Sequence, residues 1–169
     1  MVAVASSGTA VVTLPTDTQI RITREFDAPR HLVYRAWTTP ELIKRWWSGE
    51  RGEVTVAEVD LRVGGSWRYL MVANEGFEVG FHGEFSEIVP NERIVNTEAY
   101  DTGPGSEAAD ESMAPVVTTT FSEVDGRTTL MQVVECPSAE VRDMIVESGM
   151  EAGMQESMDR LEQVAISLA

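Results

Sequence analysis

The alternation of apolar and polar residues predicts that most of this chain folds into an antiparallel sheet. Residues 20–26 alternate as a half-buried strand does, and from Val54 to Glu135 the period stays close to two. Turn signals divide this later region into further strands. We place them at residues 54–61, 66–73, 77–89, 93–100, 116–124 and 127–135. Because most connections are short, neighbouring strands are expected to pair antiparallel.

Helical spacing is found before and after this region. Asp27 and Thr39 are each followed closely by a proline, so we expect them to cap two short helices. Ser138 is expected to cap a last helical segment that runs to about residue 167, with Gly149 dividing it into a short and a long helix. The apolar stripe of this segment is Met150, Met154, Met158, Leu161, Ala165 and Leu168.

The tight turns predict the registers of two hairpins. A two-residue turn at Asp125-Gly126 predicts the pairs Phe121–Leu130, Val117–Val134 and Thr119–Gln132. A three-residue loop at residues 74–76 predicts the pairs Trp67–Gly83, Tyr69–Phe81 and Met71–Val79, with Arg68 opposite His82 on the reverse face. Each hairpin then has one apolar face and one more polar face, as in a sheet that is covered on one side. The methionine-bearing helix is the natural cover.

One domain accounts for the whole pattern. We expect it over residues 19–167, preceded by a tail at residues 1–18 that is partly disordered or extends the first strand. The segment from 101 to 115 is acidic and contains glycine and proline, and a connection of this length is expected to be mobile.

Aromatic and methionine side chains are concentrated where the helices and the sheet should meet. Ordinary core packing explains any one of them, but as a set they suit the wall of a cavity for a planar or lipid-like ligand. Thr119, Gln132 and Tyr69 would be its polar contacts, although the first two could satisfy only each other. The predicted lining is Trp37, Trp46, Trp47, Trp67, Tyr69, Phe81, Phe85, Thr119, Phe121, Gln132, Met150, Met154 and Met158.

The amino-acid composition limits the classes of binding partner and the cellular location that we expect. The formal net charge of −15 disfavours nucleic acid and anionic membrane surfaces. No apolar run is long enough to span a bilayer, and the first residues do not resemble a signal peptide, so a cytoplasmic location is the default. Cys136 is the only cysteine, which excludes an internal disulfide. The sequence leaves the oligomeric state open, with a homodimer as one option.

Candidate catalytic groups are sparse. Neither His31 nor His82 has a second histidine or cysteine at metal-ligand spacing, and Cys136 has no activating neighbour close in sequence. Arg68, His82 and Glu84 are better explained by cross-strand pairing of polar side chains on the outer face of the sheet than as a catalytic cluster. We therefore expect no metal and no cofactor, and we do not expect an enzyme.

Ordered sequence blocks resemble one known family. Residues 153–161 resemble the closing helix motif of the activator-of-heat-shock-protein-90-ATPase homologue family, except that tryptophan more often stands where this chain has Met154. That departure implies a softer end to the cavity. The other matching blocks are Phe26-Asp27-Ala28-Pro29, residues 36–42, Trp46-Trp47, residues 61–68, and residues 83–90 together with 92–95.

The resemblance implies an α+β helix-grip fold of the START-like superfamily. Its seven strands would have the order 1-7-6-5-4-3-2, with two short helices after the first strand and a long helix held in the concavity. The first functional hypothesis is a non-catalytic carrier or sensor of a small apolar molecule, including lipid-like ones. The alternatives are a cyclase- or hydratase-like enzyme acting in the same cavity and a chaperone-interaction module. Chaperone contact is disfavoured because the eukaryotic activators carry a further N-terminal domain, which we expect this chain to be too short to hold.

Overall fold

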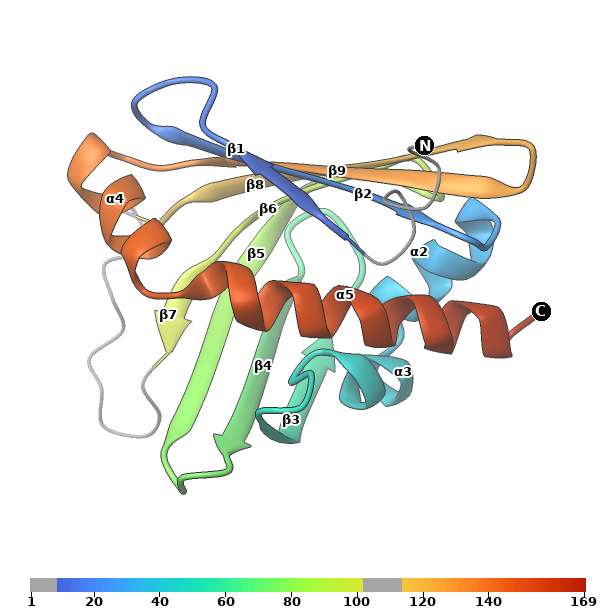
Figure 1. Ribbon diagram of the computed structural model, residues 1–169, viewed down its shortest axis with the longest axis horizontal. Helices are drawn as coiled ribbons and strands as arrows, with labels where there is room; N and C mark the ends of the chain where they lie inside the picture. Colours follow the sequence, from blue (N-terminus) through green and yellow to red (C-terminus); the bar gives the residue numbers. More distant parts are fainter. Residues whose placement is uncertain (1–8, 102–113) are drawn as a thin grey trace.

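The computed structural model describes residues 9–101 and 114–169, in which one curved antiparallel sheet holds a long C-terminal helix in its concave face (Figure 1). The start that we expect to be disordered (1–8) and most of the segment that we expect to be mobile (102–113) lie outside the described residues. The helices are α2 (Arg30–Thr38), α3 (Pro40–Trp46), α4 (Ala139–Glu147) and α5 (Met150–Ser167). The strands are β1 (Val11–Thr13), β2 (Gln19–Phe26), β3 (Gly52–Val59), β4 (Ser66–Ala73), β5 (Glu78–Val89), β6 (Arg93–Thr97), β7 (Ala99–Asp101), β8 (Val116–Val124) and β9 (Arg127–Glu135).

The strand order confirms the helix-grip prediction and adds detail to it. The order is β1-β2-β9-β8-β6-β5-β4-β3, and β7 pairs with β5. From β2 onward this is the expected order of seven strands. Two short strands are additional: β1 lies at the sheet edge beside β2, and β7 is a continuation of the β6 segment.

Both predicted hairpin registers are confirmed. Thr119 pairs with Gln132 between β8 and β9, and Tyr69 pairs with Phe81 between β4 and β5. Arg68 lies opposite His82, as expected for the reverse face. The β8–β9 turn allows its register because Asp125 and Gly126 both adopt positive φ, the backbone geometry of a tight hairpin.

The single strand predicted at 93–100 is wrong, because the segment changes course at Glu98. β6 pairs with residues 85–89 of β5, whereas β7 pairs with residues 80–82. A register shift between Phe85 and Glu87 accompanies the change. The side-chain oxygen of Thr97 accepts a hydrogen bond from the Glu84 amide at 3.0 Å, and its carbonyl accepts one from the Trp67 indole at 3.2 Å. The break places Glu98 at the concave side of a bend.

Gly83 makes this bend possible, and its replacement tests the arrangement. A Cβ atom at Gly83 would overlap the backbone carbonyl of Thr97 and lie 2.7 Å from Nε1 of Trp67. Gly83→Ala is therefore expected to lower the free energy of unfolding by about 1–3 kcal/mol in urea denaturation. Gly153→Ala is the control: its Cβ would make an ordinary 3.7 Å contact with Arg51. In a helix that change should raise stability by up to about 1 kcal/mol, so equal effects of the two variants would contradict the account.

The two short helices begin where predicted, but not with the predicted side-chain caps. Pro29 occupies the N-cap position of α2 and offers no side-chain acceptor. The carboxylate of Glu123 on β8 accepts the hydrogen bond of the Arg30 amide instead, at 2.8 Å. Thr39 is the N-cap residue of α3, yet its hydroxyl donates back to the carbonyl of Arg35. The prediction for Ser138 is confirmed, since its hydroxyl accepts from the Val141 amide at 3.2 Å.

Polar contacts fix the middle of α5 against the rest of the domain. Gly149, with φ of 83°, separates α4 from α5 as expected. Gln155 exchanges two hydrogen bonds with the backbone of Ala10, at 2.7 and 2.9 Å. Arg24 on β2, whose side chain is fully buried, pairs with Asp159 at 3.1 Å and Glu162 at 3.0 Å. These contacts hold the middle of α5 over the sheet. The first turn of α5 precedes the residues that make them.

Candidate ligand-binding cavity

A cavity of about 770 Å³ lies between the concave face of the sheet and the first half of α5. It exists because the two halves of α5 pack differently. Leu161, Val164 and Ala165 in the second half are buried in the core. Met150, Gly153 and Met154 in the first half line the cavity, and Gly153 fills none of it with a side chain. The volume is within the range of about 300–1,000 Å³ typical of small-molecule sites.

The structure brings most of the predicted lining residues together around this space. Thr119 and Phe121 are the exceptions among them. Thr119 is 1% exposed and accepts a hydrogen bond from the Gln132 amide at 3.2 Å. Phe121 packs edge-on against Tyr34 and Trp37, with centroid distances of 5.5 and 6.2 Å. Both residues therefore support the wall from behind rather than face the cavity.

Aromatic rings form the wall at the β4–β5 side. Trp47, from the end of α3, packs edge-on against Tyr69 at 5.6 Å and against Phe81 at 6.0 Å. Phe81 in turn contacts Tyr100 of β7 at 5.5 Å. These residues meet because Tyr69, Phe81 and Tyr100 are register partners on three adjacent strands. The rings offer a continuous surface for a planar or cationic group.

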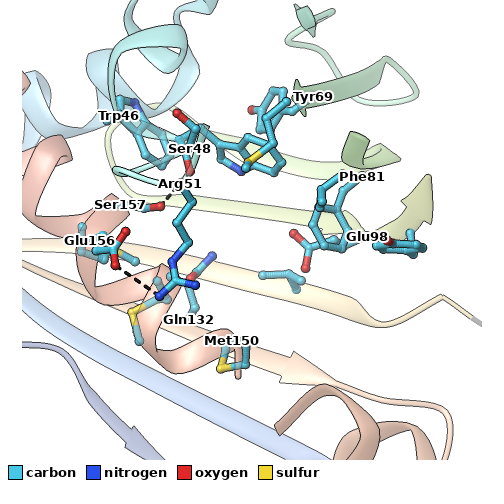
Figure 2. A pocket seen from close by; sticks show the side chains of 18 of the residues that line it. Trp46, Ser48, Arg51, Tyr69, Phe81, Glu98, Gln132, Met150, Glu156 and Ser157 are labelled. Carbon is cyan, nitrogen blue, oxygen red and sulfur yellow. Dashed lines mark hydrogen bonds and ion pairs between the residues drawn. The ribbon is translucent and has the colours of Figure 1, made fainter. Parts of the chain in front are cut away.

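Glu98 is the functional candidate that the sequence analysis missed. It lines the cavity from the bend between β6 and β7, and Figure 2 shows its carboxylate beside Phe81. Burial raises the pKa of this carboxyl group from 4.5 to about 7. Burial, together with the nearby Glu98, also raises the pKa of the Tyr69 phenol. The alternation from Ile94 through Asn96 to Glu98 places all three on one face, and this spacing is the signal that could have identified it.

The mouth of the cavity is bordered by a tightly held loop after α3. Arg51 reaches along the mouth to Glu156 on α5 and forms an ion pair at 3.2 Å, as Figure 2 shows. The same carboxylate accepts from the Glu50 amide at 3.2 Å, and these contacts lower the pKa of Glu156. Asn74 of the β4–β5 turn donates to the carbonyl of Glu50 at 3.0 Å. The loop thus connects the sheet to α5 at one side of the opening.

Comparison with known proteins identifies the family. Residues 27–165 match the family model described as Activator of Hsp90 ATPase homolog 1-like protein. The chain belongs to this family. The activator-of-Hsp90-ATPase-like family is part of the START-like superfamily, so the resemblance seen in the sequence blocks is confirmed. Its fold supports a ligand-binding module or a module of the ATPase-activator kind.

Solved structures share the fold of this family member. A Rhodobacter sphaeroides protein is 24% identical with a TM-score of 0.82, covering 94% of this chain and 99% of its own. A Mycobacterium smegmatis protein is 21% identical with a TM-score of 0.83, covering 95% and 100% respectively. A Chromobacterium violaceum protein is 28% identical with a TM-score of 0.71, covering 86% and 96%. No curated protein matches the chain at a significant level.

Within residues 9–101 and 114–169, no helix is both long and apolar enough to cross a membrane. In the same part of the chain, no group of three or more His, Cys, Asp or Glu side chains is arranged to hold a metal ion.

Proposed function

We propose that this protein binds a small apolar or aromatic molecule in the cavity between the sheet and α5, as a carrier or sensor. The observation that carries the proposal is a space of about 770 Å³ walled by aromatic rings and by the methionines of α5. Flexible methionine side chains adapt to ligands of different shape, and rings provide a large apolar contact area. Gln132 and Tyr69 supply polar groups that orient a bound molecule.

Met154→Trp tests whether the cavity is the binding site. Met154 faces the cavity from α5, so a larger indole at this position should fill part of it and displace ligand. We expect the affinity for the neutral fluorescent probe N-phenylnaphthylamine to fall about tenfold or more, which corresponds to about 1.4 kcal/mol. The measurement is the rise in probe fluorescence on titration with protein.

Met144→Trp is the matched control for this variant. Met144 lies on α4, is 67% exposed and does not line the cavity. The same substitution there should leave probe affinity unchanged. Equal losses in both variants, or no probe uptake by the unmodified protein, would refute the proposal. Native mass spectrometry of the purified protein, followed by extraction, would then identify any molecule that it retains from the cell.

Glu98 gives specific support to a second candidate, a cyclase- or hydratase-like enzyme. Such an enzyme needs an ionisable group that faces the cavity, and a carboxyl group with a pKa of about 7 is suited to proton transfer near neutral pH. The test compares molecules extracted from the unmodified protein and from Glu98→Gln. Identical molecules from both favour binding alone, whereas a pair that differ by one water would favour hydration.

A further inference from the structure

The cavity contains a carboxylate, Glu98, that forms no ion pair with another described residue. Glu98 is directed into the cavity at its aromatic side, as Figure 2 shows. Among the described residues that line the cavity, Arg51 is the only basic one, and its guanidinium is paired with Glu156 at the mouth. Glu98 is half-buried, and a carboxylate withdrawn from water without a cationic partner is unfavourable in the protein without ligand. A positively charged ligand would remove this penalty.

The aromatic rings that line the same cavity as Glu98 favour the same kind of ligand. Phe81 and Tyr100 contact each other at 5.5 Å, and Trp47 joins Phe81 to Tyr69 through edge-on contacts of 6.0 and 5.6 Å. Aromatic faces carry partial negative charge and attract ammonium groups, most strongly where water is excluded. An aromatic wall next to a carboxylate therefore combines two attractions for one cation. Long-range attraction from a net charge of −15 acts in the same direction.

We propose that Glu98 and the cavity-lining rings of Trp47, Phe81 and Tyr100 anchor the protonated amine of an apolar or aromatic amine ligand. The inference rests on the proposed binding function and specifies its ligand class. The amine would donate a charge-assisted hydrogen bond to the Glu98 carboxylate, and its hydrocarbon part would extend towards the methionines of α5. The cavity would accordingly discriminate against carboxylic acids of the same shape.

Binding of an ammonium group requires ionised Glu98, so affinity should depend on pH. The pKa of Glu98 in the protein without ligand is about 7, so the ionised fraction of its carboxyl group rises about tenfold between about pH 6 and pH 8. The affinity for an amine should rise with this fraction. The Tyr69 phenol and the Cys136 thiol stay protonated here, since burial raises the pKa of each. The other groups near this site are Tyr100 on β7, Arg142 near Cys136, the Arg51–Glu156 pair at the mouth, and His82, which points to the opposite face of β5.

Three probes with one ring system and different head groups test the anchor. They are naphthylmethylamine, naphthalenemethanol and naphthylacetate, each titrated to displace N-phenylnaphthylamine from the protein. At about pH 8 the amine is expected to bind about tenfold or more tightly than the alcohol, and the acid most weakly. Alcohol affinity should not change between about pH 6 and pH 8.

Glu98→Gln should abolish the preference for the amine and its pH dependence while keeping the affinity for the alcohol. Glu53→Gln is the matched control, because Glu53 is exposed on β3, does not line the cavity and should leave the preference intact. Uptake of N-phenylnaphthylamine without any amine preference, or a preference that persists in Glu98→Gln, overturns the anchor alone. Failure of every probe to bind overturns the binding function as well.

Discussion

Glu98→Gln is expected to stabilise the folded protein by about 3 kcal/mol at about pH 8, but by less than about 1 kcal/mol at about pH 5. The reason is the pKa of Glu98, which burial raises from 4.5 to about 7. Between these values the folded protein keeps a proton that the unfolded chain has lost. Stability therefore falls as pH rises through this range, and the neutral glutamine escapes the loss.

Thermal unfolding of both proteins at the two pH values measures this effect. For a chain of this length the difference at about pH 8 corresponds to a rise in Tm of about 6–12 °C. Glu53→Gln is the control, because Glu53 is an exposed carboxylate on β3 and its replacement should change stability by less than about 0.5 kcal/mol. Equal stabilisation by Glu98→Gln at both pH values would show that its charge is not the cause. A group retained at such a cost to stability is typical of functional sites.

Arg24→Ala is expected to lower the free energy of unfolding by about 3–5 kcal/mol. The Arg24 side chain is fully buried between β2 and α5, where it pairs with Asp159 and Glu162 and lies 4.9 Å from the centre of the Phe26 ring. Its removal leaves a void and deprives the Glu162 carboxylate, which is only 12% exposed, of its cation. Because these contacts hold the middle of α5, the cavity should also widen and bind probe less tightly.

Urea denaturation of Arg24→Ala, Arg24→Met and Arg62→Ala separates the contributions. The methionine variant retains most of the volume, so it should be less destabilised than the alanine variant. Arg62 forms an exposed ion pair with Asp60 at 2.9 Å, and its loss should cost less than about 1 kcal/mol. If Arg24→Ala behaved like Arg62→Ala, the buried pair would not be what holds α5 in place.

Much of the fold could be predicted from short-range patterns. The registers of the β4–β5 and β8–β9 hairpins followed from their turns, because a tight turn leaves one pairing that keeps apolar residues on one face. The break at Gly149 followed from the same local chemistry. The cap of α2 could not be predicted locally, since the Arg30 amide donates to Glu123 from a distant strand. At α3 the Thr39 hydroxyl donates to the preceding helix, to the carbonyl of Arg35, instead of capping its own helix.

The sequence by itself determined the alternating strands, the methionine stripe and the family blocks, because each depends on residues that are neighbours in the chain. Only the tertiary structure decided that Arg24 is buried beneath α5 and that Glu98 faces the cavity. Arg24 occupies an inward position of β2 by alternation, and Glu98 lies at the bend between β6 and β7. The role of each side chain depends on the groups that the fold brings beside it. Arg24 has two carboxylates from α5 beside it, whereas Glu98 lines a cavity with aromatic rings and forms no ion pair with another described residue. That difference makes the first residue structural and the second a candidate ligand anchor.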